Sequence, residues 1–147
     1  MDQPHLVKSL LQESKSVDIN HKNSLGLTAL HYAAQQESIE CVKLLVAVKG
    51  IKPNIQDNID KNTPLHTALI NCTSSETALE IARLLISVGA DPRIVNKDKQ
   101  RPVNLTEPEE EEIRTLLLQA TLAIQVKDEL AEQLEEEGEQ QVYYSSD

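Results

Sequence analysis

Two histidines and two cysteines are the side chains of this sequence whose chemistry first suggests a reactive site. His31 and His66 could ligate a metal ion, and Cys41 or Cys72 could act as a nucleophile beside a histidine. The histidines lie 35 residues apart, and no cysteine or carboxylate pair accompanies them at metal-ligand spacing. Cys41 falls in a core-facing helical pattern and Cys72 in a polar segment. We therefore predict no catalytic residue, no metal site and no cofactor, and we expect that the protein is not an enzyme.

The spacing of the histidines is the period of an internal repeat. Residues 26–34 read GLTALHYAA, residues 61–69 read KNTPLHTAL, and a weaker third copy at residues 99–105 reads KQRPVNL. Each copy precedes a helical pattern that contains paired leucines, at 44–45, 84–85 and 116–117. A pair of helices this short cannot bury its own apolar face, so the units must stack on one another.

The start of each unit carries signals for a short helix. Thr28 and Thr63 can cap the first turn by accepting a hydrogen bond from a backbone N–H, which is worth about 1 kcal/mol. Pro64 then occupies the first helical position, where its missing N–H does no harm. Each unit is therefore predicted to begin with a capped helix that packs tightly against the next.

These strings resemble the ankyrin repeat, whose pattern runs Gly-x-Thr-Pro-Leu-His-x-Ala-Ala and later Leu-Leu-x-x-Gly-Ala-Asp. The resemblance covers roughly residues 5–120. It implies an all-α solenoid of stacked helix-turn-helix units with short finger turns, in which His31 and His66 brace the backbone of the adjacent turn through their ring nitrogens. More loosely, the chain resembles small fungal ankyrin-repeat proteins with an acidic C-terminal segment.

The predicted organisation is a repeat domain over residues 1–124 and an acidic helical extension with a disordered tail over residues 125–147. The domain begins with a half-repeat at residues 5–22. Full repeats follow at about 23–57, 58–95 and 96–124. The last helix should start with a capping box formed by Thr106 and Glu109, and Gly138 should end it. Its apolar stripe over residues 126–134 lies too far along to reach the last repeat.

The sequence departs from the repeat pattern at three places. Lys61 and Lys99 stand where Gly26 stands in the first repeat, and a left-handed conformation there would cost about 1–2 kcal/mol, so we expect those turns to differ in type. Arg101 and Asn104 replace the capping threonine and the histidine, so the third repeat should fray first.

The second repeat is also five residues longer than the first, with the surplus around residues 71–76. That polar stretch is predicted to be an exposed loop, after which Thr73 and Glu76 would restart the helix as a second capping box. Such a loop could belong to a binding surface or could be a neutral insertion.

Charge and composition narrow the partners. Residues 1–104 hold 12 Lys and Arg against 11 Asp and Glu, whereas residues 105–147 hold 2 against 13. This acidity would repel nucleic acid, and three tyrosines without Phe or Trp offer no stacking platform for single strands. The apolar runs are too short to cross a membrane, and the cysteine usage fits a reducing compartment, so we expect cytoplasm, nucleus or both.

By resemblance, ligands of this family dock on the finger tips and on the concave side of the first helices. The apolar residues Leu25, Leu27 and Ile59 suggest an adhesive strip there, although each could pack on the neighbouring finger instead. Arg93, Lys97, Lys99 and Arg101 form a basic cluster that could meet an acidic partner or the chain's own acidic end. The positions that map to this protein-binding surface are Ser24, Leu25, Leu27, Gln35, Gln36, Ile59, Asp60, Asn62, Ile70, Asn71, Lys97, Asp98 and Gln100.

The function predicted from these features is a monomeric, non-catalytic adaptor or scaffold that binds another protein. Its sharper form is an escort for a basic client, because an acidic segment would speed the encounter and the repeats would select the partner. An alternative is a structural subunit that assembles through the amphipathic helix over residues 126–134. A small metal or thiol enzyme is a third possibility.

Overall fold

The computed structural model describes residues 18–144, with side chains through residue 136. These residues form α2 (Ala29–Gln35), α3 (Ile39–Val46), α4 (Pro64–Asn71), α5 (Ser75–Ser87), the 3-10 turn η1 (Pro102–Leu105) and α6 (Glu111–Tyr144). They contain no strand. Of the half-repeat predicted at residues 5–22, residues 5–17 lie outside the described residues.

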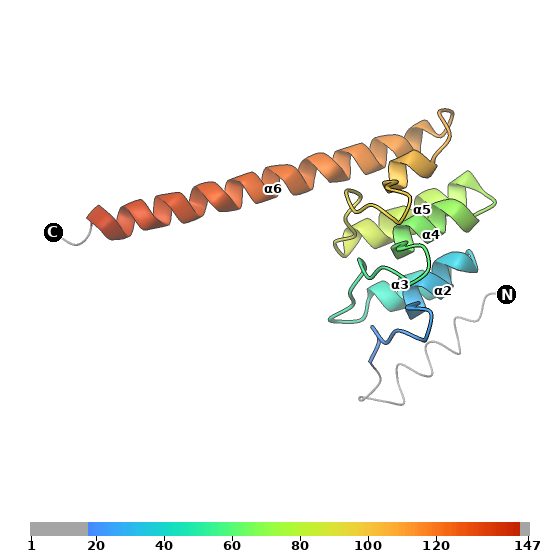
Figure 1. Cartoon of the computed structure of the whole chain (residues 1–147). Helices are drawn as coiled ribbons and strands as arrows, with labels where there is room; N and C mark the ends of the chain where they lie inside the picture. The colour runs from blue at the N-terminus through green and yellow to red at the C-terminus, as the bar shows by residue number, and fades with distance from the viewer. Residues whose placement is uncertain (1–17, 145–147) are drawn as a thin grey trace.

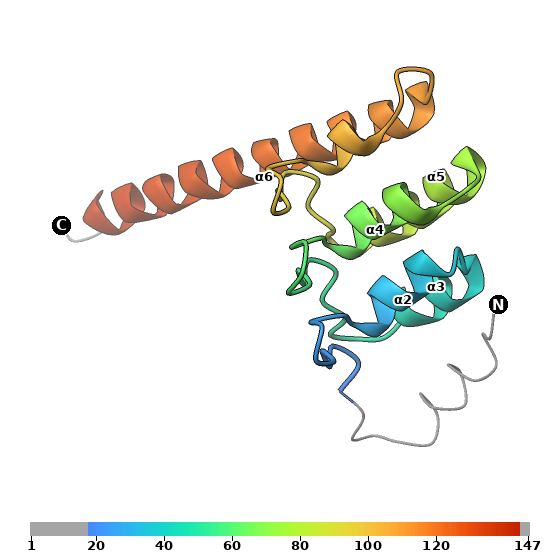
Figure 2. The ribbon, with the colours of Figure 1, turned by 45° about the vertical axis from the view of Figure 1, so that its right-hand side comes forward.

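The helices form a stack of antiparallel pairs (Figure 1). The first helices pack on one another as α2 on α4, with η1 beside α4, while the second helices pack as α3 on α5 and α5 on α6. A view turned by 45° shows the connecting turns projecting from one end of the pairs (Figure 2). The all-α stack predicted from the repeat is confirmed.

Capping fixes where the short helices start. The hydroxyls of Thr28 and Thr63 accept the backbone N–H of the residue three places on, which is the histidine in both repeats. Pro64 is the first residue of α4. The predicted roles of these three residues are therefore confirmed.

The core lies between the two helical layers. Small side chains at the crossing points, such as Ala34 and Ala68, are fully buried and let the helices approach closely. Burying one large aliphatic side chain contributes about 1.5–3 kcal/mol, so stacking supplies most of the stability that these short helices lack alone. The largest buried aliphatic residues are Leu30, Val42, Leu45, Leu65, Ile81, Leu85, Ile113 and Leu117.

The five surplus residues of the second repeat lengthen a helix and do not form the predicted loop. Helix α5 has 13 residues where α3 has 8, and three residues separate the helices in both pairs. Ser74 caps α5 by accepting the Thr77 N–H, so the predicted capping box of Thr73 and Glu76 is wrong. Thr73 instead donates both its hydroxyl and its backbone N–H to Glu37 of the preceding repeat.

The third repeat lacks a full first helix. Arg101 provides no side-chain cap, and residues Pro102–Leu105 form only a single 3-10 turn. Asn104 accepts the Arg101 N–H at 2.8 Å. The replacement of threonine and histidine thus coincides with the shortest helical element, while fraying itself stays a prediction.

Helix α6 differs from the prediction at both ends. It begins at Glu111. The Thr106 hydroxyl donates to the Val103 carbonyl and accepts from the Arg114 guanidinium, and the expected capping box with Glu109 does not form. The helix continues through Gly138 to Tyr144, because one glycine without a proline costs a helix only about 1 kcal/mol. The expected tail from Glu139 is therefore helical through Tyr144.

No described helix combines the length and apolar character needed to cross a membrane.

The finger turns occupy residues 23–27, 57–62 and 96–100, and all three contain a residue with positive φ. Gly26 has φ 80°, and Lys61 and Lys99 have 58° and 61°. The turn at 96–100 has the length and the backbone hydrogen bonds of the first turn, so the difference in type expected there is wrong; the turn at 57–62 is one residue longer, so the difference expected there is confirmed. Both lysines can adopt positive φ because a polar side chain at the start of each turn accepts two or three backbone N–H groups, which offsets the conformational cost. These residues are Asn23, Asp57 and Asn96.

Gly26 carries the sharpest backbone requirement. A Cβ there would lie 2.7 Å from the Asn58 nitrogen of the next finger, whereas a Cβ at Gly50, with φ 88°, would meet nothing within 4 Å. We expect Gly26→Ala to lower the free energy of unfolding by about 2–4 kcal/mol and Gly50→Ala by about 1–2 kcal/mol, measured by urea denaturation. Equal losses would show that the fingers are not in close contact at this point.

Candidate functional site

Each buried histidine joins two repeats. Nδ1 of His31 accepts the Thr28 N–H at 3.1 Å, so that nitrogen carries no proton. Nε2 then donates to the Asn62 carbonyl in the next finger at 2.9 Å. His66 repeats this geometry: its Nδ1 accepts the Thr63 N–H at 3.2 Å, and its Nε2 donates to the Gln100 carbonyl at 2.9 Å. The bracing role implied by the family resemblance is confirmed, and it leaves neither ring nitrogen available for a metal.

Burial lowers the pKa of both histidines, and the carbonyls of Asn62 and Gln100 oppose that effect only in part. Both side chains have no exposed surface. The neutral tautomer that the hydrogen bonds require is therefore also the form that burial favours.

The fingers are joined to one another through their backbones. The Asn58 N–H donates to the Leu25 carbonyl at 2.9 Å, and the Lys97 N–H donates to the Asp60 carbonyl at 2.8 Å. In both pairs the acceptor immediately precedes the residue with positive φ. The three turns thus form one continuous row with a repeated geometry.

Ten of the thirteen predicted binding positions are exposed. Leu25 and Ile59 keep 44% and 55% of their surface and lie on successive fingers. The second helices contribute none of these positions. The other exposed ones are Ser24, Asp60, Lys97 and Asp98 on the fingers and Gln35, Gln36, Ile70 and Asn71 at the ends of α2 and α4.

The remaining three positions, Leu27, Asn62 and Gln100, are partly buried. Their backbone carbonyls accept bonds within the finger row: Asn23 donates to Leu27, and the two histidines donate to Asn62 and Gln100. These residues hold the fingers together, and we leave them out of the binding surface. The apolar strip predicted from the sequence consequently loses Leu27.

The comparisons with known proteins agree with this geometry. Residues 2–101 match the family model for ankyrin repeats in three copies. The chain belongs to the ankyrin-repeat family. An ankyrin repeat domain from Acinetobacter baumannii has a TM-score of 0.69 and 31% identity, covering 77% of this chain and 56% of that one. Ankyrin repeats mediate protein–protein interaction, which is the coarse function that membership supports.

Three relatives show how far the likeness extends. An ankyrin repeat-containing protein of Saccharomyces cerevisiae is 38% identical, over 82% of this chain and 65% of its own length. Human protein phosphatase 1 regulatory subunit 27 is 39% identical, over 66% of this chain and 58% of its own length. Human NF-kappa-B inhibitor zeta is 32% identical, over 76% of this chain and 16% of its own length. This ankyrin-repeat chain therefore spans less than two thirds of each relative.

Two exposed apolar residues beside the ankyrin-repeat fingers were missed by the sequence mapping. Tyr32 on α2 is 42% exposed, and its hydroxyl accepts a hydrogen bond from the Asn23 amide at 2.6 Å. Val95, just before the third finger, is 43% exposed. Because Tyr32 directly follows the histidine of the repeat pattern, its position in that pattern is the sequence feature that could have identified it.

The predicted basic cluster is only partly available to a partner. Arg93 pairs with Asp91 at 2.9 Å and with Asp128 of α6 at 3.4 Å, and the first of these pairs lowers the pKa of Asp91. Nζ of Lys97 lies 3.7 Å from Oδ1 of Asp60. Asp128 of the chain's own acidic helix thus pairs with one member of the cluster, Arg93. This is one of the two alternatives that the sequence left open.

The cysteines have no nucleophilic arrangement in this ankyrin-repeat stack. Cys72 ends α4, and its burial together with the Glu37 carboxylate raises the pKa of its thiol to about 11. A thiol with that pKa is almost wholly protonated at neutral pH. Cys41 is buried. Within residues 18–136, no three His, Cys, Asp or Glu side chains lie together as metal ligands would.

The lowered pKa of both histidines predicts the direction of the pH dependence of stability. The unfolded chain binds more protons than the folded one below about pH 6.5, so the contribution of the neutral rings is complete above that pH and is lost as the pH falls. We expect the free energy of unfolding to drop between pH 7 and pH 5 by up to about 1.4 kcal/mol per pH unit and per histidine, measured by urea denaturation. The pKa values of the Asp91 and Glu37 carboxyls are also lowered, so their contribution to stability is complete above about pH 4.5 and is lost only below that pH, outside the range measured here.

The variant His31→Asn/His66→Asn separates the effect of these histidines on stability from that of other titrating groups. Asparagine is a suitable replacement because Asn104 stands at the matching position of the third repeat, where it accepts the Arg101 N–H. The variant should be less stable at pH 7 and should show a flatter slope between pH 7 and pH 5. The control is His21→Asn at an exposed position. An unchanged slope in the double variant would contradict the assignment.

Proposed function

We propose that this chain is a non-catalytic adaptor that binds another protein along its row of fingers. The observation that carries the proposal is the exposure of Leu25 and Ile59 on turns whose backbones are held by hydrogen bonds. A turn that is already ordered loses little conformational entropy on binding, so its apolar side chains can contribute most of their burial energy to affinity. Tyr32 and Ile70 extend the apolar surface onto the first helices.

The names of two relatives support a regulatory role of this kind. One is an inhibitor, of NF-kappa-B, and the other is a regulatory subunit, of protein phosphatase 1. Both names describe proteins that act on a partner. For this chain we propose the same mode of action, with a partner of its own.

The charge distribution supports a basic partner. Residues 105–147 hold 13 acidic against 2 basic side chains, while residues 1–104 are close to neutral. Attraction between this segment and a basic protein would accelerate their encounter, and the finger row would then select the partner. We therefore propose an escort for a basic client, acting as a monomer in the cytoplasm or nucleus, where both cysteines would remain free thiols.

Affinity capture with the immobilised full chain tests the finger surface. Leu25→Ser/Ile59→Ser should reduce the recovery of the bound partner at least tenfold, because each lost apolar contact is worth about 1.5–3 kcal/mol. The partner is identified by mass spectrometry, and its affinity is then measured with the purified protein. Binding should weaken as the salt concentration rises.

The matched control is Lys43→Ser/Glu80→Ser, which changes two exposed residues of α3 and α5 and leaves the net charge unchanged. It should bind like the unmodified chain. Equal binding by the finger variant would contradict the finger surface, and binding that is insensitive to salt would contradict the basic client.

A further inference from the structure

The two halves of helix α6 are held in different ways. In the first half, Ile113 and Leu117 are buried on the side that packs against α5. Among the described residues, the last ion pair between α6 and the repeats joins Asp128 to Arg93, at 3.4 Å. Every side chain of residues 125–136 is exposed. Both ribbon views show α6 continuing well beyond the repeat stack (Figures 1 and 2).

The helix beyond Asp128 depends on its own stability. We call residues 129–144 the α6 extension. Among its described side chains, at residues 129–136, none forms a hydrogen bond or an ion pair with the repeats. A helix of about 15 residues is only marginally stable in water by itself, because most helical stability in proteins comes from packing. Interactions between the side chains of the α6 extension therefore decide how fully it stays helical.

Glu132 is the centre of a group of like charges on the α6 extension. Side chains three and four residues apart lie next to one another on a helix, and like charges at these spacings destabilise it. Asp128 and Glu136 stand four residues from Glu132. Glu129 and Glu135 stand three residues from it. Each such pair lowers the helix–coil equilibrium constant about 1.4- to 2.3-fold, so the four pairs together lower it about four- to thirtyfold.

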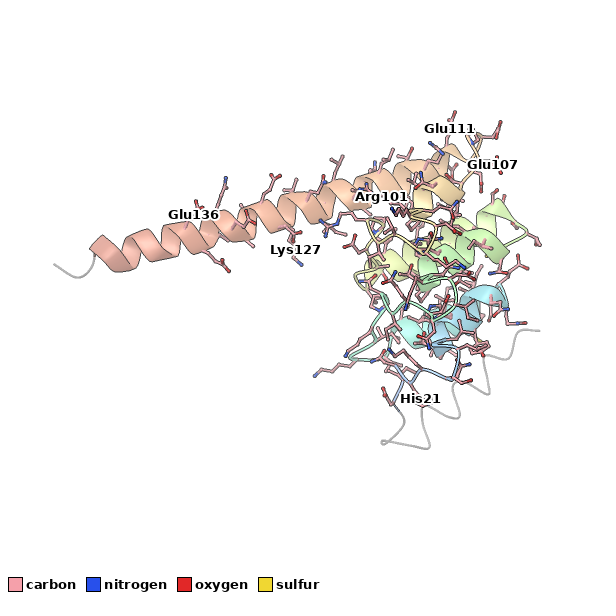
Figure 3. All side chains as sticks on the ribbon, in the orientation of Figure 1. His21, Arg101, Glu107, Glu111, Lys127 and Glu136 are labelled. Carbon is pink, nitrogen blue, oxygen red and sulfur yellow. The ribbon has the colours of Figure 1, made fainter. Side chains whose placement is uncertain are left out.

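The cations of the described residues do not offset this repulsion at Glu132. Lys127 stands five residues earlier, which at 100° per residue places it about 140° around the helix from Glu132. The basic cluster near the third finger forms one ion pair with the described part of α6, at Asp128. Figure 3 shows Glu136 on the part of α6 beyond the stack, far from Arg101 of that cluster.

We propose that the α6 extension is a charge-controlled helix, which unwinds while its carboxylates repel one another and orders when they are neutralised. The inference rests on the proposed function, because the proposed basic client would supply the neutralising charge. A partner that interacts better with the helical form than with the unwound form shifts the population toward the helix. Encounter with the client and ordering of the α6 extension are then coupled.

Amide hydrogen exchange of the full chain tests the proposal at two salt concentrations. In about 0.01 M NaCl the Debye length is about 30 Å, so the carboxylates repel one another, whereas in about 1 M it is about 3 Å and the repulsion is screened. Protection of the amides of residues 132–140 should rise at least about threefold between the two conditions. The amides of residues 113–124, in the half that packs on α5, should change much less.

Substitutions at Glu132 distinguish repulsion between neighbours from net charge, since glutamate, glutamine and lysine have similar helix propensities. In low salt, Glu132→Gln should raise the protection of the α6 extension at least about threefold, because it removes all four pairs. Glu132→Lys turns the four repulsions into attractions, so its protection should be higher still and should fall as the salt concentration rises. The matched control Glu129→Gln makes the same change of charge but removes one pair, so its gain should stay below about 2.3-fold.

Three results would overturn the proposal. Equal gains in Glu132→Gln and Glu129→Gln would show that net charge, and not the spacing of the carboxylates, sets the protection. Protection of the Glu132→Lys variant that rises with salt would show that the charges around Glu132 do not control the helix. Equal effects of salt on both halves of α6 would show that salt acts on the whole fold.

A poly-lysine peptide is the probe that separates this inference from the proposed function. Its binding in low salt should raise the protection of the α6 extension at least about threefold. Binding without this gain would refute the coupled ordering and leave the proposed function standing, because capture on the fingers needs no ordered extension. A captured partner whose binding is insensitive to salt, from a chain whose α6 extension orders with salt, would instead refute the basic client and leave the charge-controlled helix standing.

Discussion

The structure depends on a buried histidine ring whose two nitrogens are hydrogen-bonded in different repeats. In the first repeat, Nδ1 of His31 holds the start of α2 and Nε2 holds the Asn62 carbonyl of the next finger. Removing the ring would leave the buried Thr28 N–H without a partner, which costs about 1–3 kcal/mol, and would leave the Asn62 carbonyl with only the Asp57 N–H of its own finger. The same side chain therefore orders a helix and positions the surface that follows it. His66 does so again for the third finger.

This arrangement separates the residues that hold the fingers from those that can meet a partner. The carbonyls of Leu25 and Asp60 accept bonds from the next finger, while the side chains of both residues remain exposed. Because the connection uses backbone atoms, the side chains at the tips can change without loss of the row. In this chain, apolar Leu25 and Ile59 stand at those tips, and their exposure is the basis of the proposed adaptor function.

Local signals with a repeated spacing could be predicted from the sequence. Thr28, Thr63 and Pro64 act within a few residues of themselves, so their roles follow from the sequence pattern. The conformation of Lys61 could not be predicted in the same way, because it depends on the Asp57 side chain accepting three N–H groups of the turn. Five surplus residues likewise indicate an insertion, but only the Ser74 cap shows that they extend α5.

The binding surface was predicted less completely than the fold for a related reason. In the sequence, Asn62 and Gln100 look like exposed polar residues. Their backbone carbonyls, however, accept hydrogen bonds from the histidines of the preceding repeat, and the sequence alone does not show these bonds. The stripe on α6 was detectable from its spacing, whereas its exposure follows from the direction in which α5 packs.

Native-state hydrogen exchange at the amides of Asn58 and Lys97 tests most directly whether the fingers form one rigid row. Both amides donate to the preceding finger. The account predicts that they exchange only when the repeat stack opens, with the same opening free energy as core amides of α4. Exchange at the rate of an unstructured peptide while α4 stays protected would contradict it, since the fingers would then move independently of the helices.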